Sequence, residues 1–126
     1  MSIQSSADVV LVRQAVRHFA LELGFSLVDQ TKIVTAASEL ARNTLEYGGG
    51  GTVKLEALQE GIRRGLRLTF EDTGPGIPDI ELALKDGFTT GGGLGMGLSG
   101  SKRLVNEFNI ISQVGVGTCV TITKWK

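Results

Sequence analysis

Glycine is concentrated in three short segments of this 126-residue chain, at residues 48–51, 74–76 and 91–100, which hold most of its eighteen glycines. Because glycine lacks a Cβ, it permits tight turns and lets the backbone approach a bound molecule closely. A flexible linker would instead spread its glycines along a continuous polar segment. The clustering therefore predicts turns that surround a ligand.

The first third of the chain has the spacing of two amphipathic helices. Over residues 6–23 apolar side chains recur every three or four positions, and Gly24 follows as a stop signal. The second helix is predicted to begin after the N-cap Ser26, with Asp29 three positions later, and to run to Tyr47. The residues expected on the buried sides are Val9, Val12, Val16, Phe19 and Leu23 of the first helix, and Ile33, Ala37, Leu40 and Thr44 of the second.

From Thr52 onward the pattern changes to alternation, which is typical of strands. Two alternating segments on either side of residues 60–65 predict a hairpin, and two further strands are expected at residues 109–114 and 118–125. Between these pairs we expect a short helix at residues 80–85 and a firmer one that begins near Gly97 and runs through Leu104, Val105 and Phe108.

These elements predict an α+β two-layer sandwich, in which helices cover one face of a mixed, mostly antiparallel sheet. No internal repeat or linker divides the sequence, so residues 1–126 are expected to form one domain.

The composition excludes several classes of partner. Lys plus Arg and Asp plus Glu are equal at 13 each, so no strong positive charge predicts binding to nucleic acid or to a membrane. No apolar stretch approaches the roughly 20 residues of a membrane span, and the N-terminus lacks a signal-peptide pattern, which favours a cytoplasmic protein. The one cysteine, Cys119, is expected to be a half-buried strand residue.

The first cluster of candidate functional residues is the pair Glu39 and Asn43, four positions apart on the second predicted helix. Residues with this spacing have Cβ atoms about 5–6 Å apart on one helix face. Both fall at the margin of the apolar stripe rather than on the solvated side. Two ordinary polar residues at the edge of a helix would explain the pair alone, so its meaning depends on the other clusters.

The second cluster is the segment Asp-Thr-Gly-Pro-Gly at residues 72–76. Strand parity places Asp72 on the same side as the apolar Leu68 and Phe70, which directs its carboxylate toward the core. A buried carboxylate requires hydrogen-bond donors, and the exocyclic amine of adenine would suit it. An aspartate that simply opens a tight turn is the alternative explanation.

The third cluster is GGGLGMGLSGSKRLV at residues 91–105, a glycine-rich loop that leads into a helix. Backbone N–H groups at such a loop and at a helix N-terminus can bind phosphate oxygens. Residues 95–100 spell G-x-G-x-x-G, but no predicted strand precedes them as a Rossmann unit requires, and Ser101 stands at the lysine position of a P-loop. The cluster predicts a polyphosphate site, with a plain flexible loop as the alternative.

In this order the three clusters resemble the GHKL, or Bergerat, ATP-binding fold of gyrase, Hsp90, MutL, histidine kinases and bacterial anti-sigma-factor kinases. The similarity covers nearly the whole chain. The segments SELARN (38–43), EDTGPGIPDI (71–80) and GFTTGGGLGMGLSGSKRLVNEF (87–108) are similar to those of RsbT-type serine/threonine switch kinases of the stressosome. The resemblance implies ATP and Mg²⁺ as ligands.

The resemblance also implies a role for each candidate residue. Glu39 would be the general base or would orient the attacking group, Asn43 would ligate Mg²⁺, and Asp72 would bind the adenine amino group. One carboxamide with phosphate oxygens suffices for Mg²⁺, which keeps several waters. The remaining residues implied are Gly74 and Gly76 beside the base, Gly93, Gly95 and Gly97 beside the phosphates, Thr118 on the adenine side, and Ile77, Leu94, Met96 and Leu98 elsewhere in the nucleotide site.

The sequence departs from related ATPases in one place. Residues 78–90, where those proteins carry a longer lid, are few and contain no arginine, so another group must neutralise the γ-phosphate. Arg42, Lys102 and Arg103 are the candidates, although a residue of this kind is more often a solvated or packing residue.

We expect transfer of the γ-phosphoryl group to a serine or threonine of another protein. Histidine kinases of this fold carry Asn or His where Glu39 stands and need a phosphoacceptor domain, and gyrase-like ATPases need a transducer domain. The resemblance names STAS-domain stressosome proteins as substrates in general stress signalling, and a PP2C-type phosphatase activated by binding as a second partner. The alternatives are an anti-sigma factor, which binds a sigma subunit and phosphorylates its antagonist, and an ATP-dependent interaction module without transfer.

Overall fold

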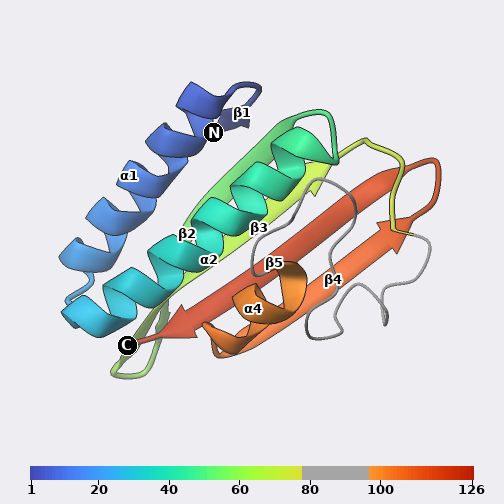
Figure 1. The fold of residues 1–126 in the computed structure, drawn as a ribbon. Coiled ribbons are helices and arrows are strands. Elements are labelled where there is room, and N and C mark those ends of the chain that lie inside the picture. The colour runs from blue at the N-terminus through green and yellow to red at the C-terminus, as the bar shows by residue number, and fades with distance from the viewer. Residues whose placement is uncertain (78–96) are drawn as a thin grey trace.

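A computed structural model describes residues 1–77 and 97–126, which form a sheet with helices on one of its faces (Figure 1). The helices and strands are, in chain order, β1 (Ser2–Ile3), α1 (Ser6–Glu22), α2 (Leu27–Glu46), β2 (Gly51–Glu60), β3 (Arg63–Asp72), α4 (Gly97–Arg103), β4 (Glu107–Gln113) and β5 (Gly117–Trp125). The predicted α+β two-layer architecture is confirmed. The helix expected at residues 80–85 lies outside the described residues.

The two long helices begin where their capping signals predict. Ser5 caps α1, since its Oγ accepts a hydrogen bond from the backbone N–H of Asp8 at 3.3 Å. Ser26 caps α2 in the same way, accepting from the N–H of Asp29 at 3.2 Å. Each bond satisfies one of the backbone donors that a helix leaves unpaired at its first turn.

The described strands pair in the order β1-β2-β3-β5-β4, and every pair is antiparallel. The mixed character expected from the sequence is therefore not seen among them. Strand β1 was not predicted, because two residues are too few to show alternation; Ser2 pairs with Thr52. Phe70 in the central strand β3 pairs with Val53 on one side and Val120 on the other, which places three apolar side chains in one row.

The core lies between the sheet and the helices. All four α2 residues expected on the buried side are buried, whereas in α1 the stripe consists of Val9, Val12, Val16 and Ala20, and Phe19 and Leu23 are only partly buried. Helices α1 and α2 pack side by side and α4 packs against α2, so α2 is the middle helix of the layer (Figure 1). One side of α2 therefore faces α4, and Gly48, just past its C-terminal end, lies against Asp72 at the end of β3.

The helix predicted to begin near Gly97 is shorter than expected. It ends at Arg103, and Phe108 belongs to β4, where it pairs with Ile122 of β5. The reason is tertiary: Asn106 donates its backbone N–H to the carbonyl of Thr123 at 3.0 Å and accepts the N–H of Trp125 at its Oδ1 at 2.7 Å. Pairing with β5 therefore begins before the helix could continue through Leu104 and Val105 to Phe108. Within residues 1–77 and 97–126, none of the helices combines the length and apolar character needed to cross a bilayer.

Candidate functional site

Glu39 lies in the middle of α2 with only 14% of its side chain exposed. Its Oε1 accepts a hydrogen bond from Nη1 of Arg42 at 3.0 Å. Its Oε2 is buried and has no hydrogen-bond partner among the described residues. A buried carboxylate oxygen without a donor is costly in free energy. Glu39 is therefore an acceptor suited to a donor that the described residues, 1–77 and 97–126, do not supply.

Asn43 follows one turn later on α2 and is partly buried. Its backbone carbonyl accepts the N–H groups of Tyr47 at 2.9 Å and of Gly48 at 3.2 Å, which ends the helix. The rise of 1.5 Å per residue separates Glu39 from Gly48 by about 14 Å along the helix. Glu39 and Asn43 thus lie one turn apart on α2, and Gly48 lies just past its C-terminal end; in this axial order the three positions are called a row.

Asp72 meets that row from the sheet. It is the last residue of β3, and its Oδ1 accepts the backbone N–H of Gly74 at 2.9 Å and that of Thr118 at 3.3 Å. A Cβ placed on Gly48 would lie 2.5 Å from Cβ and Cγ of Asp72, so the aspartate side chain packs directly on the end of α2. The predicted orientation of Asp72, toward the helix layer, is confirmed.

The turn after Asp72 is fitted tightly against the protein itself. A Cβ on Gly74 would lie 2.7 Å from Cα of Gly48, and one on Gly76, whose φ is 79°, would lie 2.5 Å from the carbonyl oxygen of Gln113. The N–H of Ile77 donates to Oγ of Ser112 at 2.7 Å. Both glycines are thus required because backbone atoms of other segments approach them closely. The sequence predicted these glycines only as residues beside the base.

Ser112 and Gly48 belong to this site and were not predicted from the sequence. Oγ of Ser112 lies 2.9 Å from Oγ1 of Thr118, and together the two hydroxyls connect β4, β5 and the turn after β3. A signal for Ser112 was present, because it follows Phe108 and Ile110 at the same strand parity and is the polar member of that series. Gly48 stands in a glycine cluster, but no sequence pattern predicts that it lies against Asp72.

The phosphate end of the predicted site is described only in part. Gly93, Leu94, Gly95 and Met96 lie outside the described residues. Gly97 opens α4 as expected, and Leu98 is buried in the core at 6% exposure. The described residues contain no group of three or more His, Cys, Asp or Glu arranged to hold a metal ion. The phosphate contacts therefore stay predictions.

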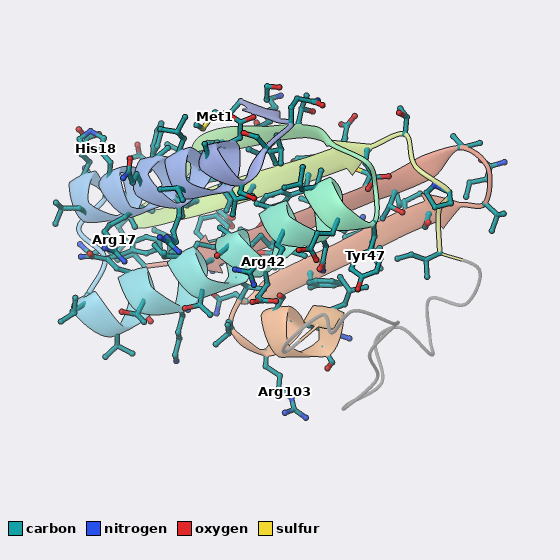
Figure 2. The ribbon with its side chains drawn as sticks, turned by 45° about the horizontal axis from the view of Figure 1, so that its top comes forward. Met1, Arg17, His18, Arg42, Tyr47 and Arg103 are labelled. Carbon is teal, nitrogen blue, oxygen red and sulfur yellow. The ribbon has the colours of Figure 1, made fainter. Side chains whose placement is uncertain are left out.

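The three cations considered for the γ-phosphate are placed differently. Arg42 pairs with Glu39, whereas Lys102 and Arg103 are exposed at the C-terminal end of α4. Figure 2 shows Arg42 on the C-terminal half of α2 and Arg103 pointing away from that helix. Arg42 thus contacts Glu39, the candidate catalytic group.

A separate hollow of about 480 Å³ lies on the sheet face opposite the helices. Its lining residues are Arg67, Thr69, Glu107, Phe108, Asn109, Thr121 and Thr123. None of the predicted site residues lines this hollow, so its volume does not mark it as the predicted nucleotide site.

The chain matches the family model described as histidine kinase-, DNA gyrase B- and HSP90-like ATPase over residues 28–126. It is 49% identical over 123 residues to the serine/threonine-protein kinase RsbT of Bacillus subtilis (strain 168), covering 98% of this chain and 92% of that protein. It is 34% identical over 126 residues to the anti-sigma F factor of Anoxybacillus flavithermus, covering 94% of this chain and 85% of that protein.

Solved structures show the same fold at low sequence identity. The RsbU and RsbW domains of Rv1364c from Mycobacterium tuberculosis superpose with a TM-score of 0.68 at 23% identity, over all of this chain and 32% of that one. The catalytic domain of histidine kinase ThkA superposes with a TM-score of 0.57 at 18% identity, over all of this chain and 97% of that one.

Proposed function

The chain belongs to the histidine kinase-, DNA gyrase B- and HSP90-like ATPase family, and on that premise we propose that it is an ATP-dependent protein serine/threonine kinase. The observation that carries the transfer step is the buried Oε2 of Glu39, which has no partner among the described residues. The similarity to a serine/threonine kinase over nearly the full length of both chains supports the choice of acceptor.

The adenine of ATP is proposed to lie at Asp72. The two hydrogen bonds that Asp72 accepts from Gly74 and Thr118 both use Oδ1, which leaves Oδ2 for the exocyclic amine of the base. An Asp fixed at one oxygen presents the other in a defined direction, which favours one base over another. Thr118 and Ser112 hold the strand end that carries these contacts.

The triphosphate is proposed to extend from Asp72 along α2 toward Glu39. Asn43 lies between these two residues in sequence and supplies a carboxamide oxygen, a ligand that suits Mg²⁺ together with phosphate oxygens. When bound, Mg²⁺ would neutralise charge on the phosphates. In-line transfer of this kind depends mainly on positioning and electrostatics.

Glu39 is proposed to receive the proton of the acceptor hydroxyl. The hydroxyl oxygen forms a bond to the γ-phosphorus while the bond to the β–γ bridging oxygen breaks, and ADP leaves with that electron pair. The hydroxyl proton passes to Oε2 of Glu39, a role for which a positioned carboxylate contributes about 10²- to 10⁴-fold in rate.

We propose STAS-domain proteins of the stressosome as the substrates, a PP2C-type phosphatase activated by direct binding as a second partner, a role as a switch in general stress signalling, and the cytoplasm as the location. The support for these finer statements is the resemblance of SELARN, EDTGPGIPDI and the glycine-rich segment to RsbT-type kinases.

The proposal is tested by incubating the protein with γ-³²P-labelled ATP, Mg²⁺ and a purified STAS-domain protein. We expect label on a serine or threonine of the STAS protein, dependent on Glu39. Absence of transfer from a protein that binds MgADP would contradict the kinase assignment and leave a nucleotide-dependent interaction module.

An anti-sigma factor is the second candidate, favoured by the 34% identity to an anti-sigma F factor. Such a protein would bind a sigma subunit with an affinity that depends on the nucleotide. Size-exclusion chromatography with a sigma subunit separates the two proposals, since an RsbT-type kinase is expected to elute without it.

A further inference from the structure

The pair formed by Arg42 and Glu39 has an unequal exposure. Arg42 is 45% exposed at its side chain and Glu39 is 14% exposed, with 3.0 Å between Nη1 and Oε1. Ion pairs with one member in solvent contribute little to the stability of a fold. Stability alone therefore gives a weak reason for an arginine at this position.

The two oxygens of Glu39 differ in their surroundings. Oε1 is bound by Arg42, and Oε2 is buried without a partner among the described residues. The terminal torsion of a glutamate is broad, so an unbound carboxylate turns easily and exchanges its two oxygens. A guanidinium that holds one oxygen limits this rotation, because charge-assisted hydrogen bonds are short and directional.

We propose that Arg42 is a positioning residue for phosphoryl transfer, acting through Glu39. Its guanidinium holds Oε1, so that Oε2 stays directed into the site and can accept the proton of the attacking hydroxyl. This inference rests on the proposed kinase function and assigns Arg42 a different task from the γ-phosphate contact considered from the sequence. The pairing with Glu39 supports the change, since Nη1 of Arg42 is bound to the carboxylate of Glu39.

The test compares Arg42→Gln and Arg42→Lys with the wild-type protein in STAS phosphorylation, measuring kcat and KM for ATP separately. Loss of orientation at the reacting centre costs about 10- to 100-fold, so we expect Arg42→Gln to lower kcat by that factor with KM for ATP changed less than about twofold. Arg42→Lys should recover part of the loss, because an ammonium still donates to Oε1 but lacks the fixed geometry of a guanidinium.

Arg17→Gln is the matched control, since it removes an exposed arginine from α1, outside the row formed by Glu39, Asn43 and Gly48 (Figure 2). It should leave kcat and KM for ATP near the wild-type values. Calorimetric titration with MgADP verifies that the Arg42 variants keep a folded nucleotide site. A wild-type protein that binds MgADP but transfers no phosphate would contradict the proposed function before any variant is compared.

The double variant Glu39→Gln, Arg42→Gln distinguishes positioning from an independent role. In single-turnover reactions at high enzyme concentration, we expect it to be no slower than Glu39→Gln alone. Three results would overturn the proposal: a raised KM with unchanged kcat in Arg42→Gln, which would return Arg42 to the phosphates; a kcat that is unchanged or increased; or a further loss of the same size in the absence of Glu39.

Discussion

The two ends of the proposed nucleotide site differ in how completely the described residues satisfy their hydrogen-bonding groups. At the adenine end Asp72, Gly74, Ser112 and Thr118 are joined by hydrogen bonds within the chain. At the transfer end Glu39 has one oxygen bound by Arg42 and the other buried without a partner among the described residues. On the proposed function, the comparison predicts that the recognition end is formed before ligand binds, whereas the reactants complete the transfer end.

The largest expected effect is at the transfer end. Glu39→Gln keeps the size of the side chain but cannot accept the hydroxyl proton, so the transfer rate should fall by about 10²- to 10⁴-fold. Affinity for MgADP should change little, because Glu39 lies at the end of the row away from Asp72. Single-turnover transfer of ³²P and calorimetry measure the two quantities. A variant that transfers phosphate at the wild-type rate would remove Glu39 from the mechanism.

The next effect is at the adenine end, where the affinity for nucleotide should fall while the rate of transfer is kept. Asp72→Asn keeps an acceptor for the N–H groups of Gly74 and Thr118 but loses the charged oxygen proposed for the adenine amine. A hydrogen bond to a charged group is worth about 1.5–3 kcal/mol, so affinity for MgATP should fall by roughly 10- to 100-fold, with kcat at saturation largely kept. The neighbouring exposed Glu71→Gln is the control and should bind as the wild type does.

The contact between the end of α2 and the sheet gives a smaller effect. Gly48→Ala would place a Cβ 2.5 Å from Asp72 and 2.6 Å from the carbonyl oxygen of Thr44. Overpacking of this kind costs about 1–3 kcal/mol, and it should lower both the free energy of unfolding and the affinity for MgADP. Urea denaturation with and without MgADP measures both. Unchanged values would show that Asp72 does not depend on this contact.

The smallest effect concerns Cys119, which is partly buried in β5. Burial, followed by the negative charge of Glu71, raises the pKa of its thiol above the ordinary value of 9.0. A raised pKa means that the folded state favours the protonated thiol, so this contribution to stability is present below the ordinary pKa and is lost as pH rises above it. Alkylation by iodoacetamide near pH 8 should be slower in the folded than in the unfolded chain. Equal rates would contradict the burial.

The features that could be predicted from the sequence are those with a local cause. Ser26 and Asp29 mark the start of α2, and alternation through Leu68 and Phe70 places Asp72 on the helix side of the sheet. Local spacing also places Glu39 and Asn43 one turn apart. These signals depend only on the geometry of one helix or one strand, so they can be read from the sequence without knowledge of the rest of the fold.

The features that escaped prediction depend on contacts between distant segments. The end of α4 at Arg103 is set by the pairing of Asn106 with β5, whereas the spacing of Leu104, Val105 and Phe108 fits a helix equally well. The packing of Asp72 on Gly48 likewise needs the end of α2 to be placed against the end of β3. No local pattern reports either arrangement.

On the proposed function, one ligand occupies both ends of this site. An NMR titration of the ¹⁵N-labelled protein with MgADP tests it most directly. We predict that the backbone amides of Gly74 and Thr118 and the side-chain amide of Asn43 shift together with one dissociation constant. Absence of binding, or shifts confined to the opposite sheet face around Arg67 and Thr121, would contradict the claim.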